Sequence, residues 1–151
     1  MRVTSDSFKD GKPIPATHSA DGEGTLPPLN ISDVPSRTVS IAITVHDPDV
    51  PKERRPDGNF DHWIVWNLPP DTSQIDNPTD HGGKVGTTTI GSHDWVAAGP
   101  PPGDGPHRYY FTVYALDTQF DLPDSTTRAE LESAIAGHVV ESAELMGTYE
   151  R

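Results

Sequence analysis

The stretch Arg37–Asp47, RTVSIAITVHD, alternates apolar with small or polar residues along its whole length and decides the fold class. The apolar positions recur at every second residue, at Val39, Ile41, Ile43 and Val45. A period of two is typical of a β-strand, because successive side chains point to opposite faces of a sheet. The segment is therefore predicted to be a strand with one apolar face.

Two further segments have the pattern of central strands. Phe60–Leu68 and Arg108–Leu116 are largely apolar on both faces, as in a sheet that is covered on both sides. Pro48–Asn59, between the first two strands, is too long for a tight hairpin, and loops of that length are often functional. Gly99–Pro106 reads GPPPGDGP and predicts a stiff, non-helical approach to the third strand.

A helix is predicted only near the C-terminus. Thr127 and Glu130 form a capping box, which marks a helix start. Residues at helical spacing follow, at Leu131, Ile135, His138, Ser142 and Leu145, and Gly147 is expected to end the helix. The fold class is therefore mainly β with a C-terminal helix.

Composition sets limits on function. The 151 residues predict one domain spanning residues 1–151, and 11 basic against 23 acidic residues give a net charge of −12. This charge argues against nucleic-acid and anionic-membrane partners. The absence of cysteine excludes disulfides and thiol chemistry. Without a signal-like N-terminus or an apolar run of about 18 residues, we expect no membrane span and a cytoplasmic location.

The acidic residues are unevenly chosen, since 16 of the 23 are Asp while only 4 of the 11 basic residues are Lys. Dense carboxylates hold water and counter-ions, so this bias favours a halophilic source over an ordinary acidic domain. A melting temperature that rises steeply between low and molar KCl would test this hypothesis.

Polar residues stand where the apolar pattern of each strand should continue. Asp47 extends the apolar face of the first strand, His62 shares the face of Ile64 on the second, and His107 precedes the third on the face of Tyr109. If the first two strands are antiparallel neighbours, Asp47 and His62 meet at one rim of the sheet. Taken singly, Asp47 could cap a turn and each histidine could be structural; together they predict a pocket.

Asp47, His62, His107 and Tyr109 suit a small anion. A nearby carboxylate is expected to raise a histidine pKa, and imidazoles with a phenol offer donors to phosphate or carboxylate oxygens. Two histidines and a carboxylate could also hold iron or zinc, but no metal motif is present and we predict no metal or cofactor. A serine hydrolase is disfavoured because Gly-x-Ser-x-Gly is absent.

Several segments together resemble the phosphatidylethanolamine-binding protein family, and most of all its bacterial and archaeal Raf-kinase-inhibitor-like branch. The matching segments run almost from end to end: Ser7-Phe8, Gly11–Pro15, Pro27–Leu29, Asp47–Pro51, Asp61–Pro69, Gly99–Gly103, His107–Phe111, Gly137–Val139 and Gly147–Arg151. The resemblance implies a sandwich of antiparallel β-sheets with Greek-key connections, a C-terminal helix and a small anion pocket at one end.

The resemblance also assigns roles to individual residues. Asp47, His62, His107 and Tyr109 would line the pocket, and its walls would be shaped by Pro48, Pro100 and Pro101. Asp49 and Arg108 would form a structural ion pair, and the Val50–Pro51 bond would be cis. The chain departs from the branch at Asp94–Ala98, where Trp replaces a usual Tyr and two Ala replace Gly-Pro.

The function implied is non-enzymatic binding of a small anionic or phosphorylated ligand, with a kinase or a protease as the candidate regulated partner. Homodimers are common in the branch, so a second copy is another candidate partner. Two alternatives remain open: a metal-assisted or acid–base hydrolase that uses Asp47 and His62, and a protein-interaction module that acts through Pro48–Asn59.

Overall fold

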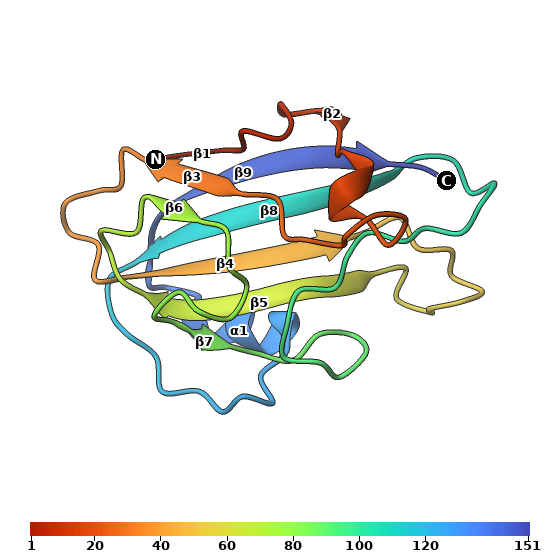
Figure 1. Cartoon of the computed structure of the whole chain (residues 1–151). Coiled ribbons are helices and arrows are strands. Elements are labelled where there is room, and N and C mark those ends of the chain that lie inside the picture. Colours follow the sequence, from red (N-terminus) through yellow and green to blue (C-terminus); the bar gives the residue numbers. More distant parts are fainter.

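The three strands predicted from the sequence form the centre of a six-stranded sheet in the computed structural model, which describes residues 1–151 (Figure 1). The strand order is β2-β9-β8-β4-β5-β7. Every neighbouring pair is antiparallel except β2 and β9, which run parallel. The bounds of these strands are Lys12–Pro13 for β2, Ser40–Asp47 for β4, Phe60–Leu68 for β5, Lys84–Val85 for β7, His107–Leu116 for β8 and Val139–Tyr149 for β9.

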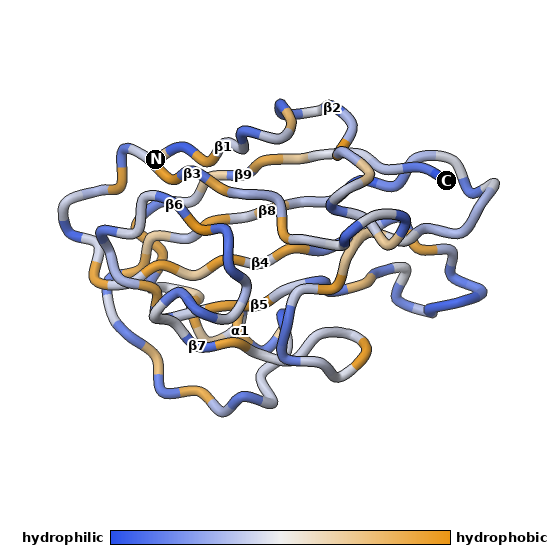
Figure 2. Tube along the Cα trace, viewed as in Figure 1, coloured by the Kyte–Doolittle hydropathy of each residue, from blue (hydrophilic) through white to orange (hydrophobic).

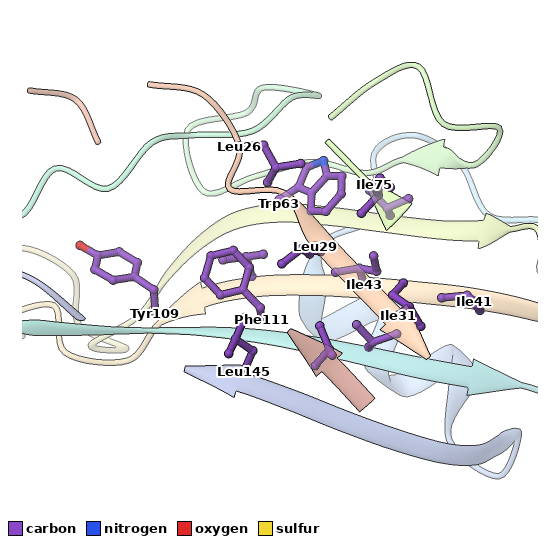
Figure 3. Packing of buried hydrophobic residues seen from close by; sticks show 14 of the residues in the cluster. Leu26, Leu29, Ile31, Ile41, Ile43, Trp63, Ile75, Tyr109, Phe111 and Leu145 are labelled. Carbon is purple, nitrogen blue, oxygen red and sulfur yellow. The ribbon is translucent and has the colours of Figure 1, made fainter. Parts of the chain in front are cut away.

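A smaller sheet covers one face of the large sheet. It has the order β1-β3-β6, with β1 at Arg2–Thr4, β3 at Leu29–Ser32 and β6 at Gln74–Ile75. The main hydrophobic core lies between the two sheets, where Leu29 and Ile31 of β3 pack with Ile43 and Phe111 of the large sheet (Figure 3). The molecule is thus a mainly β sandwich, and the expected fold class is confirmed.

The helix α1, Arg128–Ile135, covers the opposite face of the large sheet. It begins at the predicted capping box, in which Glu130 N donates to the Thr127 side chain and Thr127 N donates to Glu130 Oε1. A second apolar cluster joins Leu131 and Ile135 to residues that β4, β5 and β8 turn to this side, namely Ala42, Ile64, Trp66 and Leu116.

The predicted continuation of this helix to Gly147 is wrong. Gly137 has φ +85°, a left-handed conformation that ends a helix at low cost in glycine. The chain then becomes β9, which pairs with the whole length of β8. Leu145, expected on the helix, lies in the core between the sheets. Its spacing from Leu131 fits a helix by coincidence, because β9 also turns every second residue inward.

The first predicted strand begins later than expected. A turn in which Thr38 N donates to the Pro35 carbonyl precedes β4, and Val39 is 44% exposed instead of buried. In Figure 2 hydrophobic residues recur along β4 and β5, and the outer part of the loop that joins these strands is hydrophilic. No helix in the structure has the length and apolar character needed to cross a membrane.

Two bulges in β5 change which face its side chains occupy. Val45 pairs with Trp63 but His46 pairs with Asp61, so His62 is an extra residue in the ladder. The bulge turns His62 toward the side of Trp63, not that of Ile64 as the alternation predicted. A second register shift near Asn67, whose φ is +56°, brings Leu68 into the core between the sheets in the same way.

Candidate functional site

One cavity of about 490 Å³ opens at the end of the sandwich where β4 ends and β5 and β8 begin. In Figure 1 this end carries the long loop that joins β4 to β5 and the loop that leads into β8. Of the residues that the sequence predicted for the site, Asp47, His62, Pro100, Pro101, His107 and Tyr109 line the cavity. Pro48 is half-buried beside Asp47 and does not line it.

Asp47 and His107 form a buried pair at the base of the cavity. His107 Nδ1 lies 2.6 Å from Asp47 Oδ2, and each side chain is only 4% exposed. Asp47 Oδ1 accepts a second hydrogen bond of 2.7 Å from the Asp49 backbone N–H. The other ring nitrogen of His107, Nε2, has the longer contact, 3.3 Å to Asp104 Oδ2. The pair joins the end of β4 to the start of β8, and the weaker contact at Nε2 is the one that a ligand could replace.

His62 has a different environment from His107. Its Nδ1 lies 2.6 Å from the Val96 carbonyl, which can only accept, so Nδ1 carries the proton of the neutral ring. Burial lowers the pKa of His62 from 6.5 to about 4, against the opposing effects of the Val96 carbonyl and of Asp47. Asp47 does raise this pKa, as expected of a nearby carboxylate, but desolvation outweighs its effect and the pKa of His62 falls. Neutral His62 keeps Nε2 as a hydrogen-bond acceptor.

Tyr109 lies at the boundary between the hydrophobic core and the cavity. Its ring is 1% exposed and belongs to the main core, while its hydroxyl points away from the other core side chains (Figure 3). Burial, followed by the negative charges of Asp47 and Asp49, raises the pKa of Tyr109 well above its usual value. The phenol therefore stays protonated at neutral pH and can donate a hydrogen bond.

Asp47 and His62 are hydrogen-bonded to other groups and not to each other. Asp47 accepts from His107 and from Asp49 N, and His62 Nδ1 is held by the Val96 carbonyl. No group of three or more His, Asp or Glu side chains is arranged to hold a metal ion.

Asp49 and Arg108 form a second contact between the same two strand ends. Arg108 donates from Nε to Asp49 Oδ2 at 2.9 Å and from Nη2 to Oδ1 at 2.8 Å, and its backbone N–H donates to Oδ2 at 2.8 Å. These bonds lower the pKa of Asp49 below its usual value. The Val50–Pro51 bond is trans, contrary to the cis bond that the resemblance implied, and the chain reverses in the following turn, where Arg54 N donates to the Pro51 carbonyl.

The segment Asp94–Ala98, where the chain departs from the family branch, forms one wall of the cavity. Val96 and Ala97 line it, and Val96 N donates to the His62 carbonyl at 2.9 Å. The Trp95 ring lies against the rings of His62 and Phe111, with centroid distances of 5.9 and 6.1 Å. The departure therefore falls on residues that hold His62 in place.

Sequence reasoning missed part of the mouth of the cavity. Arg54, Arg55 and Val50, from the loop between β4 and β5, line it together with Phe60 and Ala20. The length of this loop pointed to a functional role, but no periodicity showed which of its side chains turn inward. Adjacent arginines in an acid-rich chain were the available signal.

A two-sheet sandwich with a histidine- and aspartate-lined cavity at the strand ends defines a class of β-rich proteins, and comparison identifies the family. The family model described as phosphatidylethanolamine-binding protein matches residues 4–150. The chain belongs to this family. A UPF0098 protein of Chlamydia muridarum is 43% identical over 151 residues, covering 100% of this chain and 99% of the relative. Another, from Pyrococcus abyssi, is 37% identical and covers 100% and 86%.

Solved structures agree with this assignment. A structure described as a homologue of phosphatidylethanolamine-binding protein, from Chlamydia trachomatis, has a TM-score of 0.94 and 42% identity, and the match covers 99% of this chain and 97% of the other. YbcL of E. coli, described as a new member of the mammalian family, has a TM-score of 0.87 and 30% identity, with coverage of 99% and 98%.

Proposed function

We propose that this protein is a non-enzymatic binding protein whose cavity holds a small anionic group of the phosphate type. The observation that carries the proposal is the set of polar atoms at the inner end. The Tyr109 hydroxyl stays protonated and can donate, and His107 Nε2 has only a long contact to Asp104. His62 Nε2 can accept, and the Asp47 carboxylate already accepts from His107. A phosphate that keeps one proton both accepts and donates, so it can satisfy both kinds of group.

This protonated form also reduces the electrostatic repulsion between the phosphate and the Asp47 carboxylate. A fully ionised phosphate would face a buried carboxylate, whereas a phosphate monoanion can donate its own O–H to an acceptor such as His62 Nε2. The second pKa of a phosphate monoester is about 6. Binding should therefore strengthen as the pH falls from about 8 toward 6.

The same chemistry fits a phosphorylated side chain of another protein. A kinase or a protease is the regulated partner that the family resemblance implied, and it remains part of this proposal. A free phosphorylated amino acid and inorganic phosphate present the shared chemical group without the rest of such a partner.

NMR of the imidazole nitrogens tests the proposal. We expect O-phosphoserine and inorganic phosphate to shift the signals of His62 and His107, while exposed His138 and His93 serve as internal controls. Tyr109→Phe removes one donor without changing the ring and should weaken binding several-fold. Unchanged His62 and His107 signals at millimolar ligand, at both pH 6 and pH 8, would rule out a phosphate-type ligand.

A further inference from the structure

The loop between β4 and β5 carries two arginines to the mouth of the cavity. The backbone N–H groups of Arg54 and Arg55 both donate to the Pro51 carbonyl, at 2.9 and 3.1 Å, and Gly58 N donates to the Arg55 carbonyl at 2.8 Å. The loop is therefore a hydrogen-bonded turn. Figure 2 shows its hydrophilic outer part beyond the ends of the apolar strands.

The Arg55 side chain is held by an aromatic ring. Its guanidinium carbon lies 5.0 Å from the centre of the Phe60 ring, a cation–π geometry. Phe60 in turn packs against the His62 ring, with centroids 4.6 Å apart. This stack connects the mouth of the cavity to its inner end, so Arg55 is positioned before any ligand arrives.

Neither arginine has a carboxylate partner, although acidic residues outnumber basic ones by 23 to 11. Arg108, Arg128 and Arg151 each form an ion pair with an aspartate. No carboxylate oxygen lies within 4.0 Å of the guanidinium nitrogens of Arg54 or Arg55. Two guanidinium groups without partners on the wall of a cavity leave several donors free for an external anion.

The cavity is also larger than one phosphate group requires. Its volume of about 490 Å³ lies within the range of about 300–1,000 Å³ that is usual for sites of drug-sized ligands. A phosphate at the inner end, beside His107 and Tyr109, would leave the part of the cavity next to Arg54 and Arg55 free for the rest of the ligand.

We propose that Arg54 and Arg55 form a second anion subsite, and that the ligand is a small organic phosphate with a second anionic group, a carboxylate or another phosphate. This proposal rests on the proposed function of the inner end. The inner groups hold the phosphate, and the guanidinium groups at the mouth select molecules that carry the second charge.

Two probes that differ only in that second charge test the proposal. 3-Phosphoglycerate has a carboxylate where glycerol 3-phosphate has a hydroxymethyl group. Calorimetric titration of the intact protein should show tighter binding of 3-phosphoglycerate by about tenfold or more, since each charge-assisted pair contributes on the order of that factor. Arg54→Gln/Arg55→Gln should remove this preference and leave the affinity for glycerol 3-phosphate within about twofold.

Arg2→Gln/Arg37→Gln is the matched control, because it removes the same two charges from exposed positions that do not line the cavity. It should keep the preference for 3-phosphoglycerate. Equal affinity for both probes in the unmodified protein, or a preference that survives in the double variant, would overturn the second subsite alone. If neither probe binds, the proposed function fails with it.

Discussion

Two acid–base pairs tie the end of β4 to the start of β8, and they lie in opposite surroundings. Asp47 and His107 are each 4% exposed and face the cavity. Arg108 is 49% exposed and Asp49 25%, and both face solvent. His107 and Arg108 are consecutive residues of one strand, so their side chains point to opposite faces. Two neighbouring residues of β8 therefore belong to a buried polar site and to a surface ion pair.

The difference in exposure between the two pairs predicts how the stability contributed by each pair should depend on salt and on pH. Water and ions screen the outer pair, so it is sensitive to salt. The inner groups are removed from solvent, where protonation changes cost more and salt has little access. Three perturbations separate these responses.

The largest effect is expected from Asp47→Ala. It leaves His107 buried without its carboxylate and Asp49 N without its acceptor. Breaking a buried pair in this way costs about 3–5 kcal/mol of unfolding free energy. Urea unfolding measures it, with Asp49→Ala as the matched control on the outer face. Asp47→Asn, which keeps an acceptor, should fall between Asp47→Ala and the unmodified protein; equal losses at Asp47 and Asp49 would remove the distinction between the faces.

The next effect is a pH dependence from His62. Its pKa is about 4 in the folded protein against 6.5 as the reference value, so between these pH values the unfolded chain binds a proton that the folded protein excludes. Stability should therefore fall as the pH drops from about 6.5 to 4, by up to about 3 kcal/mol from this residue. His62→Asn keeps a donor for the Val96 carbonyl but does not titrate. Its unfolding free energy, measured across this range, should be flatter; a slope equal to that of the unmodified protein would contradict the buried neutral ring.

The smallest effect is expected from Arg108→Ala. The pair with Asp49 is well aligned but open to solvent, so its loss should lower the melting temperature by a few degrees at low salt. In molar KCl the gap to the unmodified protein should shrink, while the gap caused by Asp47→Ala stays. Differential scanning calorimetry at both salt concentrations checks this. Full stability of Arg108→Ala at low salt would count against a structural role for the pair.

The strands were predicted correctly where apolar and polar residues alternate without a break. The prediction failed where a bulge or a long-range pairing changes the backbone. β4 and β8 alternate without interruption, and the residues predicted on their apolar faces lie in the core, apart from Val39, which precedes β4 and is exposed. In β5 the extra residue at His62 reverses the faces, and single-sequence periodicity cannot reveal a bulge that depends on the partner strand. The last strand, β9, was mistaken for helix because its pairing with β8 is a long-range contact that overrides local spacing.

The polar residues at the strand ends were predictable because each interrupts an apolar pattern, and the structure gathers Asp47, His62, His107 and Tyr109 around one cavity. Their environments were not predictable. Whether a histidine is held neutral depends on burial and on one backbone carbonyl, Val96, that lies 34 residues away in the chain. Which side chains of a loop line a cavity likewise depends on its turn geometry.

The pairing of β2 with β9 has a consequence for folding kinetics. Lys12 and Pro13 lie beside Gly147 and Thr148. Position 147 requires glycine, because a side chain there would collide with Ile14 and Phe8. Contacts between such distant parts of a chain form late, because closing so large a loop costs entropy before any contact compensates for it. Until β2 docks, β9 is an unpaired edge of the large sheet. We therefore expect slow refolding, with self-association of partly folded chains as the competing reaction.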